Sequence, residues 1–310
     1  MEENERQFLL SLFSLDKKLS DNQKIRKLYS LSSNIERNYK VIEIKKRNGK
    51  IRKVYSPSYY LKNIQRQILN EVLYDKTTYD FVTAYCKNKT IVDNAKIHVN
   101  KNIILKLDIK NFFDNISFID VYKIYESFGF SNRICGLLTY LTTYKEYIPQ
   151  GSPTSSYLSN LIMRGFDYEV YTWCAEKNIN YTRYSDDMTF SMDKYDKSII
   201  SFIRKKLYKL GLELNNGKIC VVSKSNKQKI TGIVVNKKMQ VDSKYRKKIR
   251  QEIFFIKKYG IDSHLNKINI IDKQKYIQSL LGRINFVLQV DNKNKEFIEY
   301  KKYIKENKIL

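Results

Sequence analysis

The sequence has 310 residues, with 58 Lys and Arg against 32 Asp and Glu, and its formal net charge is +26. Hydrophobic residues make up 42%, enough for a sizeable core, while 10 glycines and 3 prolines exclude a collagenous or linker-rich chain. This charge on a folded chain favours a polyanionic partner such as nucleic acid, although a codon bias toward Lys, Asn, Ile and Tyr is an alternative source of it.

Further features exclude other classes of protein. No apolar run approaches the roughly 18 residues of a membrane span. The N-terminus, MEENERQFLLSLFSLDKK, lacks the basic start and the cleavage site of a signal peptide. The four cysteines are widely spaced without a Cys-x-x-Cys pair, which indicates a reducing cytoplasm. With only two histidines, a metal site is expected to use carboxylates and a hard ion such as Mg²⁺.

The N-terminal part of the sequence predicts helices followed by a hairpin. Residues 1–38 form the expected N-terminal helical segment. Two β-prone stretches, VIEIKK and IRKVYSP, flank Arg47-Asn48-Gly49-Lys50 and predict a β-hairpin closed by an Asn-Gly turn. Apolar residues at spacings of three and four then predict a helix packed on the hairpin: Leu61, Ile64, Ile68 and Val72.

Strand and helix patterns alternate in the middle of the sequence. The apolar run at 102–109 predicts a strand that ends at Asp108. Ser117 is the expected N-cap of a helix that Gly129 terminates. A second helix is expected over 132–144.

The next part carries a loop, a helix and a second hairpin. The loop at 148–153 leads into one long helix, expected over 154–177. Residues 181–192 predict a tight hairpin with Asp186 and Asp187 at its tip.

The C-terminal part is predicted to be mainly helical. A helix is expected over 197–210 and a β segment over 229–236, in KITGIVVN. From about residue 240 the chain is basic, with two apolar stripes at helical spacing. The stripes are Tyr245, Ile249, Ile253 and Ile256, and Ile277, Leu281, Ile284 and Leu288.

Three aspartates lie at the ends of predicted strands. Charged side chains in such places are costly unless they bind something. If the strand that ends at Asp108 neighbours the hairpin of Asp186 and Asp187, the carboxylates can hold two divalent ions. Such ions activate an attacking hydroxyl and stabilise a leaving pyrophosphate in nucleotidyl transfer. An isolated Asp-Asp pair is more often a solvated turn, so the surrounding motifs decide between these interpretations.

Three motifs resemble the catalytic motifs of reverse transcriptases. Tyr184-Ser185-Asp186-Asp187 resembles their Y-x-D-D box, and LKLDIKNFFD resembles their first catalytic motif, with Asp108 as its carboxylate. Between them, Pro149-Gln150-Gly151-Ser152-Pro153-Thr154-Ser155 resembles the PQG-x-P-S-S loop of the bacterial enzymes. The order and the spacing of the motifs both agree with the family.

The resemblance implies a fold and a metal site. The fold is α+β, the right-hand polymerase architecture with an RRM-like palm sheet, fingers and a helical thumb. Fingers and palm are expected over 39–235 and the thumb over 236–310, after the helical segment at 1–38. The implied ligands of two Mg²⁺ ions, with Mn²⁺ as a substitute, are Asp108, Ile109, Asp186 and Asp187, and the aspartates are the implied catalytic residues.

The same resemblance implies a dNTP-binding site formed by Arg52, Lys53, Phe113, Gln150, Gly151 and Lys218. Phe113 falls where the family has a steric gate against a ribose 2′-hydroxyl. The Gln150-Gly151 backbone would line the nascent base pair. Arg52 and Lys53 match triphosphate-binding cations, with an exposed basic turn as the alternative. Lys218 matches a lysine that protonates pyrophosphate, with an ordinary surface lysine as the alternative.

Two further motifs resemble those of retron reverse transcriptases. Asn94-Ala95-Lys96-Ile97-His98 matches their N-A-x-x-H motif, and Ile230-Thr231-Gly232 resembles their V-T-G motif. His98 is interpreted as structural or RNA-facing, not as a metal ligand. Cations interleaved with aromatics in the expected thumb suit phosphate contacts and base stacking, with solvated helix faces as the alternative. The implied RNA-binding residues are Asn94, His98, Thr231, Gly232, Lys244, Tyr245, Arg246, Lys247 and Arg250.

The retron resemblance implies an RNA-directed DNA polymerase that binds its own structured noncoding RNA (msr-msd). Such an enzyme uses dNTPs and primes from a guanosine 2′-OH, so that the product is a branched RNA–DNA hybrid, msDNA. We expect a cytoplasmic protein with no membrane association, acting in antiphage defence with a separately encoded effector protein. The alternatives are a group II intron-like or other defence-associated reverse transcriptase, and a catalytically silent RNA-binding module.

Overall fold

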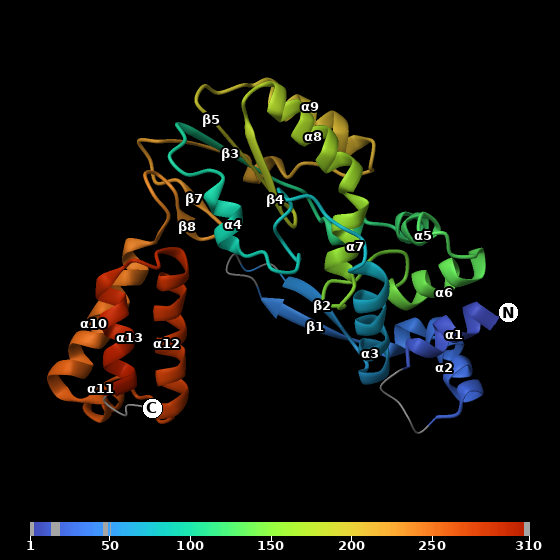
Figure 1. Ribbon diagram of the computed structural model, residues 1–310, viewed down its shortest axis with the longest axis horizontal. Coiled ribbons are helices and arrows are strands. Elements are labelled where there is room, and N and C mark those ends of the chain that lie inside the picture. Colours follow the sequence, from blue (N-terminus) through green and yellow to red (C-terminus); the bar gives the residue numbers. More distant parts are fainter. Residues whose placement is uncertain (1–2, 14–18, 46–48, 50, 307–310) are drawn as a thin grey trace. The chain divides into compact units, whose positions relative to one another are not determined.

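The computed structural model describes residues 3–13, 19–45, 49 and 51–306. Helices and antiparallel strands alternate along the chain, so the predicted α+β class is confirmed (Figure 1). The chain forms two compact units. The first comprises Met1–Asn88, Leu107–Met188 and Asp196–Ile219, and the second comprises Lys89–Lys106, Thr189–Tyr195 and Cys220–Leu310.

The first unit begins with helices that lead into the predicted hairpin. α1 (Glu3–Ser11) and α2 (Asp21–Ser33) are followed by the 3₁₀ helix η1 (Ile35–Asn38). β1 (Tyr39–Lys45) and β2 (Ile51–Pro57) pair antiparallel, in a register that sets Tyr39 opposite Pro57 and Lys45 opposite Ile51. Every residue of β2 is therefore paired with a residue of β1.

Of the predicted Asn-Gly turn, Arg47-Asn48 and Lys50 lie outside the described residues. Gly49 has a φ of 80°, which a glycine adopts without steric cost. The helix expected after the hairpin is confirmed as α3 (Tyr59–Gln67), which continues into the π-helical turn η2 (Ile68–Leu73). The apolar residues that predicted it are buried: Leu61, Ile64, Ile68 and Val72.

The two helices expected after the first catalytic motif are also present. α5 (Phe118–Glu126) starts at Ser117, which forms a reciprocal capping box with Asp120. Gly129, with a φ of 82°, follows the end of this helix and turns the chain. α6 (Asn132–Thr142) comes next, two residues shorter than expected.

The single helix expected over 154–177 is wrong. The structure has two helices there, α7 (Ser155–Ile162) and α8 (Arg164–Glu176). Met163 ends the first and begins the second, and its ψ of −4° departs from the roughly −42° of a regular α-helix. Its side chain is fully buried, and Gly165, two residues later, is the glycine that stands near this break in the sequence.

A four-stranded sheet carries the aspartates at the ends of its strands. Its order is β4-β5-β3-β6, with β3 (Ile103–Asp108), β4 (Asn180–Tyr184), β5 (Asp187–Met192) and β6 (Cys220–Ser223). β4 and β5 form the predicted hairpin, and α9 (Ser198–Tyr208) follows it. Because β3 and β5 are neighbours, the strand that ends at Asp108 lies next to the strand that begins at Asp187.

In the second unit, the β segment expected over 229–236 is present as a small hairpin. β7 (Lys229–Ile230) pairs antiparallel with β8 (Ile233–Val234), and β8 pairs with β9 (Gln240–Val241). The chain reverses at Thr231-Gly232, whose φ angles are 44° and 92°. The turn chemistry of a Thr-Gly pair therefore divides a run that reads as one strand.

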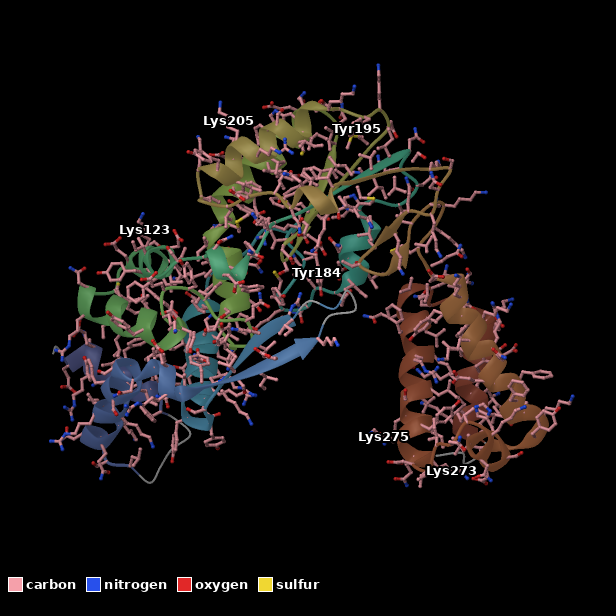
Figure 2. All side chains as sticks on the ribbon, turned by 180° about the vertical axis from the view of Figure 1, so that it is seen from behind. Lys123, Tyr184, Tyr195, Lys205, Lys273 and Lys275 are labelled. Carbon is pink, nitrogen blue, oxygen red and sulfur yellow. The ribbon has the colours of Figure 1, made fainter. Side chains whose placement is uncertain are left out.

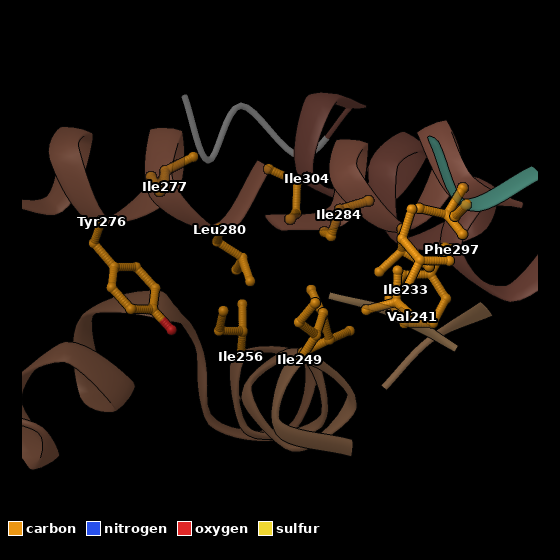
Figure 3. Close-up of a cluster of buried hydrophobic side chains, with 14 of the residues drawn as sticks. Ile233, Val241, Ile249, Ile256, Tyr276, Ile277, Leu280, Ile284, Phe297 and Ile304 are labelled. Carbon is orange, nitrogen blue, oxygen red and sulfur yellow. The ribbon is translucent and has the colours of Figure 1, made fainter. Parts of the chain in front are cut away.

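Helices build the rest of the second unit, as expected (Figure 1). They are α4 (Ile91–Lys96), α10 (Ser243–Tyr259), α11 (Ile261–Lys267), α12 (Lys273–Val290) and α13 (Lys295–Glu306). Figure 3 shows the core that the last four share with the small hairpin. In this core Ile256 of α10 lies across from Leu280 of α12, and Ile249, Ile277 and Ile284 are buried in the same cluster. On α12 the buried stripe also includes Leu280 and Val287, while the predicted Leu281 and Leu288 are only partly buried.

Candidate active site

A cavity of about 730 Å³ in the first unit gathers the predicted catalytic and dNTP-binding residues. It is also lined by Tyr184, which Figure 2 labels. Of the predicted residues of these two groups, all except Gly151 line it: Asp108, Ile109, Asp186, Asp187, Arg52, Lys53, Phe113, Gln150 and Lys218. The lining thus combines carboxylates, cations and an aromatic ring.

Asp108 is held at the end of β3 by two side chains. The Nζ atom of Lys218 lies 2.5 Å from its Oδ2 atom, and the Nδ2 atom of Asn215 donates to its Oδ1 atom at 3.0 Å. The backbone N–H of Asn215 also donates to the carbonyl of Asp108 at 2.8 Å. Both partners belong to the segment at the 3₁₀ helix η4 (Asn216–Lys218). Asp108 is 4% exposed, and the ammonium of Lys218 offsets its charge.

The turn between β4 and β5 brings the second carboxylate to the same place. Ser185 adopts a φ of 62°, in the left-handed region that is uncommon for a residue other than glycine. The hydroxyl of Tyr85 donates to Ser185 Oγ at 3.3 Å. The N–H of Ile109 donates to the carbonyl of Asp186 at 3.1 Å, which joins the turn to the residue after Asp108.

The carboxylates and Lys218 influence one another's protonation. Burial raises the pKa of the Asp186 carboxyl, and the negative charge of Asp108 raises it further, while Lys218 acts in the opposite direction. Burial alone lowers the pKa of Lys218, but its hydrogen bond to Asp108 and the charge of that carboxylate outweigh burial and raise it. The carboxylates of Asp108 and Asp186 therefore favour a positive charge bound next to them.

The donor chemistry of this site fits a hard cation, because carboxylate oxygens are the ligands that Mg²⁺ prefers. Within the described residues, no three His, Cys, Asp or Glu side chains are grouped closely enough to hold a metal ion. The ammonium of Lys218 supplies the positive charge at Asp108 instead. The assignment of individual metal ligands stays a prediction.

The predicted dNTP-binding side chains lie around the same cavity. Arg52 and Lys53 are exposed on β2, with Lys53 opposite Glu43 in the hairpin register. Phe113 begins the 3₁₀ helix η3 (Phe113–Asn115) and is half-buried, whereas its neighbour Phe112 is buried. The exposed cations and the half-buried ring are accessible to a ligand in the cavity.

Gly151 permits a close contact between the predicted loop and the hairpin. Its φ is 116°, and a Cβ atom there would lie 2.7 Å from the carbonyl oxygen of Tyr55 and 2.8 Å from Cγ1 of Val54. The N–H of Tyr55 donates to the carbonyl of Gln150 at 2.7 Å. The glycine is therefore required by the packing of the loop on β2.

The two motifs at 94–98 and 230–232 meet in the second unit. Thr231 Oγ1 donates to the carbonyl of Ile91 at 3.2 Å. His98 is fully buried, and its Nδ1 atom shares a hydrogen bond of 2.7 Å with Ser191 Oγ. Asn94 is also buried. Because neither side chain reaches the surface, the structure gives no support to the expected RNA contact of Asn94 and His98, and it favours the structural interpretation of His98.

Comparisons with known proteins decide the family. A family model described as reverse transcriptase (RNA-dependent DNA polymerase) matches residues 44–235. The retron Ec83 reverse transcriptase of Escherichia coli is 30% identical over 297 residues, which cover 88% of this chain and 89% of that protein. This chain belongs to the retron reverse transcriptases. The retron Ec86 reverse transcriptase of Escherichia coli is 29% identical over 261 residues, covering 83% and 78% of the two chains.

As a retron reverse transcriptase, the protein is an RNA-dependent DNA polymerase, which acts on template RNA and dNTPs. Its fold is shared more widely. The solved structure of telomerase from Candida albicans, in complex with the TWJ fragment of telomeric RNA, matches with a TM-score of 0.51 at 12% identity. The match covers 89% of this chain and 66% of the telomerase chain, and at this identity it shows a common fold alone.

Among the C-terminal helices of this retron reverse transcriptase, the predicted RNA-binding cations fall into two groups. Lys244 and Lys247 are exposed on α10. Arg250 instead forms a two-pronged ion pair with Glu296 of α13, at 2.6 and 2.7 Å. The charge of Arg250 is therefore engaged in holding α10 to α13.

Arg246 and Tyr245 are also engaged within the second unit. Arg246 donates to the carbonyl of Val241 at 3.1 Å and to the side chain of Gln240 at 3.2 Å. The ring of Tyr245 packs edge-on against Phe286, with ring centroids 5.8 Å apart. Both side chains therefore support the start of α10, and Lys244 and Lys247 are the more accessible cations.

Two residues that support the site, Asn215 and Arg183, were not predicted from the sequence. Asn215, which orients Asp108, precedes Lys218 in GLELNNGK, and only its nearness to that lysine could have indicated its role. Arg183 is fully buried behind the Ser185 turn. A charged residue inside the strand pattern YTRY was the available signal for Arg183, because a buried charge needs a partner.

Proposed function

We propose that this retron reverse transcriptase binds its own structured noncoding RNA (msr-msd) and reverse transcribes it from a guanosine 2′-OH into branched msDNA. The observation that carries the proposal is the cavity in which Asp108, Lys218 and the Asp186-Asp187 turn meet. The same cavity is lined by the cations of β2 and by Phe113. Family membership supports the polymerase chemistry, and the retron relatives support the RNA-primed product.

In the proposed site, Asp108, Asp186 and Asp187, with Ile109 beside them, hold two Mg²⁺ ions, for which Mn²⁺ can substitute. Ions held there would supply the positive charge needed to activate the attacking hydroxyl and to stabilise the leaving pyrophosphate. Asn215 orients the Asp108 carboxylate through its hydrogen bond. Lys218 keeps a proton next to that carboxylate, where it can be donated to pyrophosphate.

The incoming dNTP is proposed to lie against the hairpin. Arg52 and Lys53 bind its triphosphate, because both cations are exposed and line the cavity. Phe113 excludes a ribose 2′-hydroxyl by its bulk. Gly151 lets its loop approach β2, and Gln150 thereby faces the cavity next to the nascent base pair.

We assign residues 1–38 to an N-terminal helical segment, 39–235 to fingers and palm, and 236–310 to a thumb. In the thumb, Lys244 and Lys247 contact RNA phosphates and release counterions. The Thr231-Gly232 turn, which precedes these lysines in the sequence, is proposed as a further contact with the RNA.

The cellular setting is proposed from the retron relatives. The protein acts in the cytoplasm in antiphage defence, with a separately encoded effector protein. Within the residues that the structure describes, no helix has the length and apolar character needed to cross a membrane.

The test uses the purified full chain, labelled dNTPs, Mg²⁺ and an RNA transcribed from the stem-loop-forming DNA that flanks the gene. We expect labelled DNA joined to RNA through a 2′–5′ linkage, which a debranching enzyme releases. An unrelated RNA of equal length is the control template. Extension only from an annealed 3′-OH primer would contradict the retron reaction, and no incorporation on either template would indicate a silent RNA-binding module.

A further inference from the structure

A buried ion pair lies directly behind the turn that carries Asp186. Arg183 and Asp167 both have fully buried side chains. The Nε atom of Arg183 donates to Asp167 Oδ1 at 2.8 Å, and its Nη2 atom donates to Oδ2 at 2.6 Å. The hydroxyl of Tyr181 donates to the same Oδ1 atom at 2.8 Å. The carboxylate thus fixes the plane and the orientation of the guanidinium.

The remaining nitrogen of this guanidinium reaches the turn. Arg183 Nη1 donates to the carbonyl of Ser185 at 3.0 Å and to Asn160 Oδ1 at 3.1 Å. Asn160 is itself fixed, because its Nδ2 atom donates to the carbonyl of Ala84 at 2.8 Å. One planar side chain on β4 is therefore bonded to α7, α8 and the turn.

Stability alone does not account for this arrangement. Replacing a buried ion pair by apolar residues of similar size is often neutral or stabilising, because desolvation offsets the attraction between the charges. The bond to the Ser185 carbonyl has a different consequence. Ser185 is held at a φ of 62°, and its carbonyl belongs to the peptide plane that leads into Asp186.

We propose that Arg183 is a positioning residue for the polymerase reaction: its guanidinium, oriented by Asp167 and Asn160, holds the Ser185 carbonyl and so directs the Asp186 carboxylate into the cavity. The inference rests on the proposed role of Asp186. The turn is then held from two sides, since the N–H of Ile109 bonds the next carbonyl, that of Asp186, at 3.1 Å.

This role separates Arg183 from the residues that contact ligands. Arg183 is not among the residues that line the cavity, so its effect on the reaction has to pass through the turn. Loss of the guanidinium bond therefore misplaces a carboxylate without removing any RNA or dNTP contact. Misplacement of about 1 Å at a reacting centre can reduce a rate on the order of 100-fold.

The test compares Arg183→Met/Asp167→Asn and Arg183→Lys with Tyr181→Phe in the full chain. The double variant removes both charges together, and Arg183→Lys keeps a charge without the planar fork. Tyr181→Phe is the matched control, because it removes one hydrogen bond to Asp167 and leaves the bond from Arg183 to Ser185. Each variant is assayed for kcat and KM for dNTP, for the Mg²⁺ concentration at half-maximal activity, for RNA affinity and for thermal unfolding.

We expect the double variant and Arg183→Lys to lower kcat by about 10- to 100-fold and to raise the half-maximal Mg²⁺ concentration, with KM for dNTP and RNA affinity within about twofold. Tyr181→Phe should change neither kcat nor the Mg²⁺ dependence by more than about twofold. If the double variant does not fold, Arg183→Lys decides. A folded Arg183→Lys protein with the kcat and Mg²⁺ dependence of the unchanged chain overturns the positioning role.

Asp186→Asn, assayed in parallel, separates this inference from the proposed function. If Asp186→Asn retains full synthesis, the proposed role of that carboxylate has failed. If Asp186→Asn abolishes synthesis while Arg183→Lys retains normal kinetics, only the positioning role has failed.

Discussion

The ammonium of Lys218 contacts the carboxylate of Asp108 at 2.5 Å, within the cavity that Asp186 and Asp187 also line. Lys218 comes from the segment around η4, and Asp108 ends β3, so the fold brings together two residues that are far apart in the sequence. This contact places a proton donor beside the first proposed metal ligand.

Replacing this donor should slow the chemical step. We predict that Lys218→Met lowers kcat on the order of 100-fold with KM for dNTP changed far less, as expected of a general acid. Lys110→Met is the matched control, because Lys110 forms an exposed ion pair with Glu213 at 3.2 Å and should leave kcat within about twofold. Steady-state dNTP incorporation measures both. Equal kcat values for the two variants would show that Lys218 is an ordinary surface lysine.

Gly151→Ala should strain the loop that packs on β2. The added methyl group would meet the Tyr55 carbonyl at 2.7 Å, on a backbone whose φ of 116° disfavours any side chain. We predict a loss of about 1–3 kcal/mol in the free energy of unfolding and a raised KM for dNTP. Chemical denaturation and incorporation kinetics provide the measurements.

Gly136→Ala is the control for that substitution. Gly136 lies inside α6, where, apart from the helix's own nearby backbone and the adjacent residues, no atom of the described residues lies within 4 Å of an added Cβ. Alanine there should stabilise the protein by about 0.5–1 kcal/mol. If both variants were equally stable, the contact between the loop and β2 would not require a glycine.

The burial of His98 predicts a pH-dependent stability. Burial, together with a smaller contribution from the charge of Lys101, lowers the pKa of His98 to about 3. Between about pH 3 and 6.5 the unfolded chain binds a proton that the folded chain does not. The free energy of unfolding should therefore fall as the pH is lowered through this window, by about 1.4 kcal/mol per unit from this residue.

His98→Gln tests this dependence, because glutamine does not titrate. The variant should show a shallower fall in stability from pH 6.5 to 5, measured by urea unfolding at each pH. A slope unaffected by His98→Gln would contradict the buried neutral state of this histidine.

The exposed lysines of α10 should contribute to RNA binding, whereas Arg250 should contribute to the stability of the C-terminal helices. We predict that Lys244→Gln/Lys247→Gln weakens RNA binding and lowers the slope of log Kd against log salt by about 1–2, because two exposed phosphate contacts are lost. Arg250→Gln should mainly destabilise the C-terminal helices, since it leaves Glu296 without its ion pair. Filter binding across a salt series and thermal unfolding distinguish the two effects. An unchanged slope in the lysine variant would exclude these contacts.

Patterns in the sequence predicted the parts that depend on local chemistry. The β1–β2 hairpin, the capped helix at Ser117 and the hairpin of Asp186-Asp187 each follow from turn residues, caps and periodicity. The break at Met163 was not predicted, although Gly165, two residues later, is a residue type that weakens a helix interior. The division of 229–236 depended on left-handed angles at Thr231-Gly232, which an apolar run conceals.

The residues of the candidate site also divide into those that the sequence indicated and those that it did not. The aspartates, Lys218 and the β2 cations belong to motifs with a defined order, so the sequence indicated them. Asn215 and the Arg183–Asp167 pair are defined by tertiary contacts, which the charge inside YTRY and the nearness of Asn215 to Lys218 signal only indirectly. The burial of Asn94 and His98 likewise depends on tertiary packing, which is why their motif alone suggested an RNA contact.

The most direct test of the account is DNA synthesis by the Asp186→Asn/Asp187→Asn protein on the structured RNA from the gene's flanking DNA. The two amides keep the shape of the turn but remove the proposed metal ligands. We predict RNA affinity within about twofold of the unchanged chain and a loss of dNTP incorporation by at least about 1,000-fold. Synthesis at the rate of the unchanged chain would contradict the claim that these carboxylates carry the reaction.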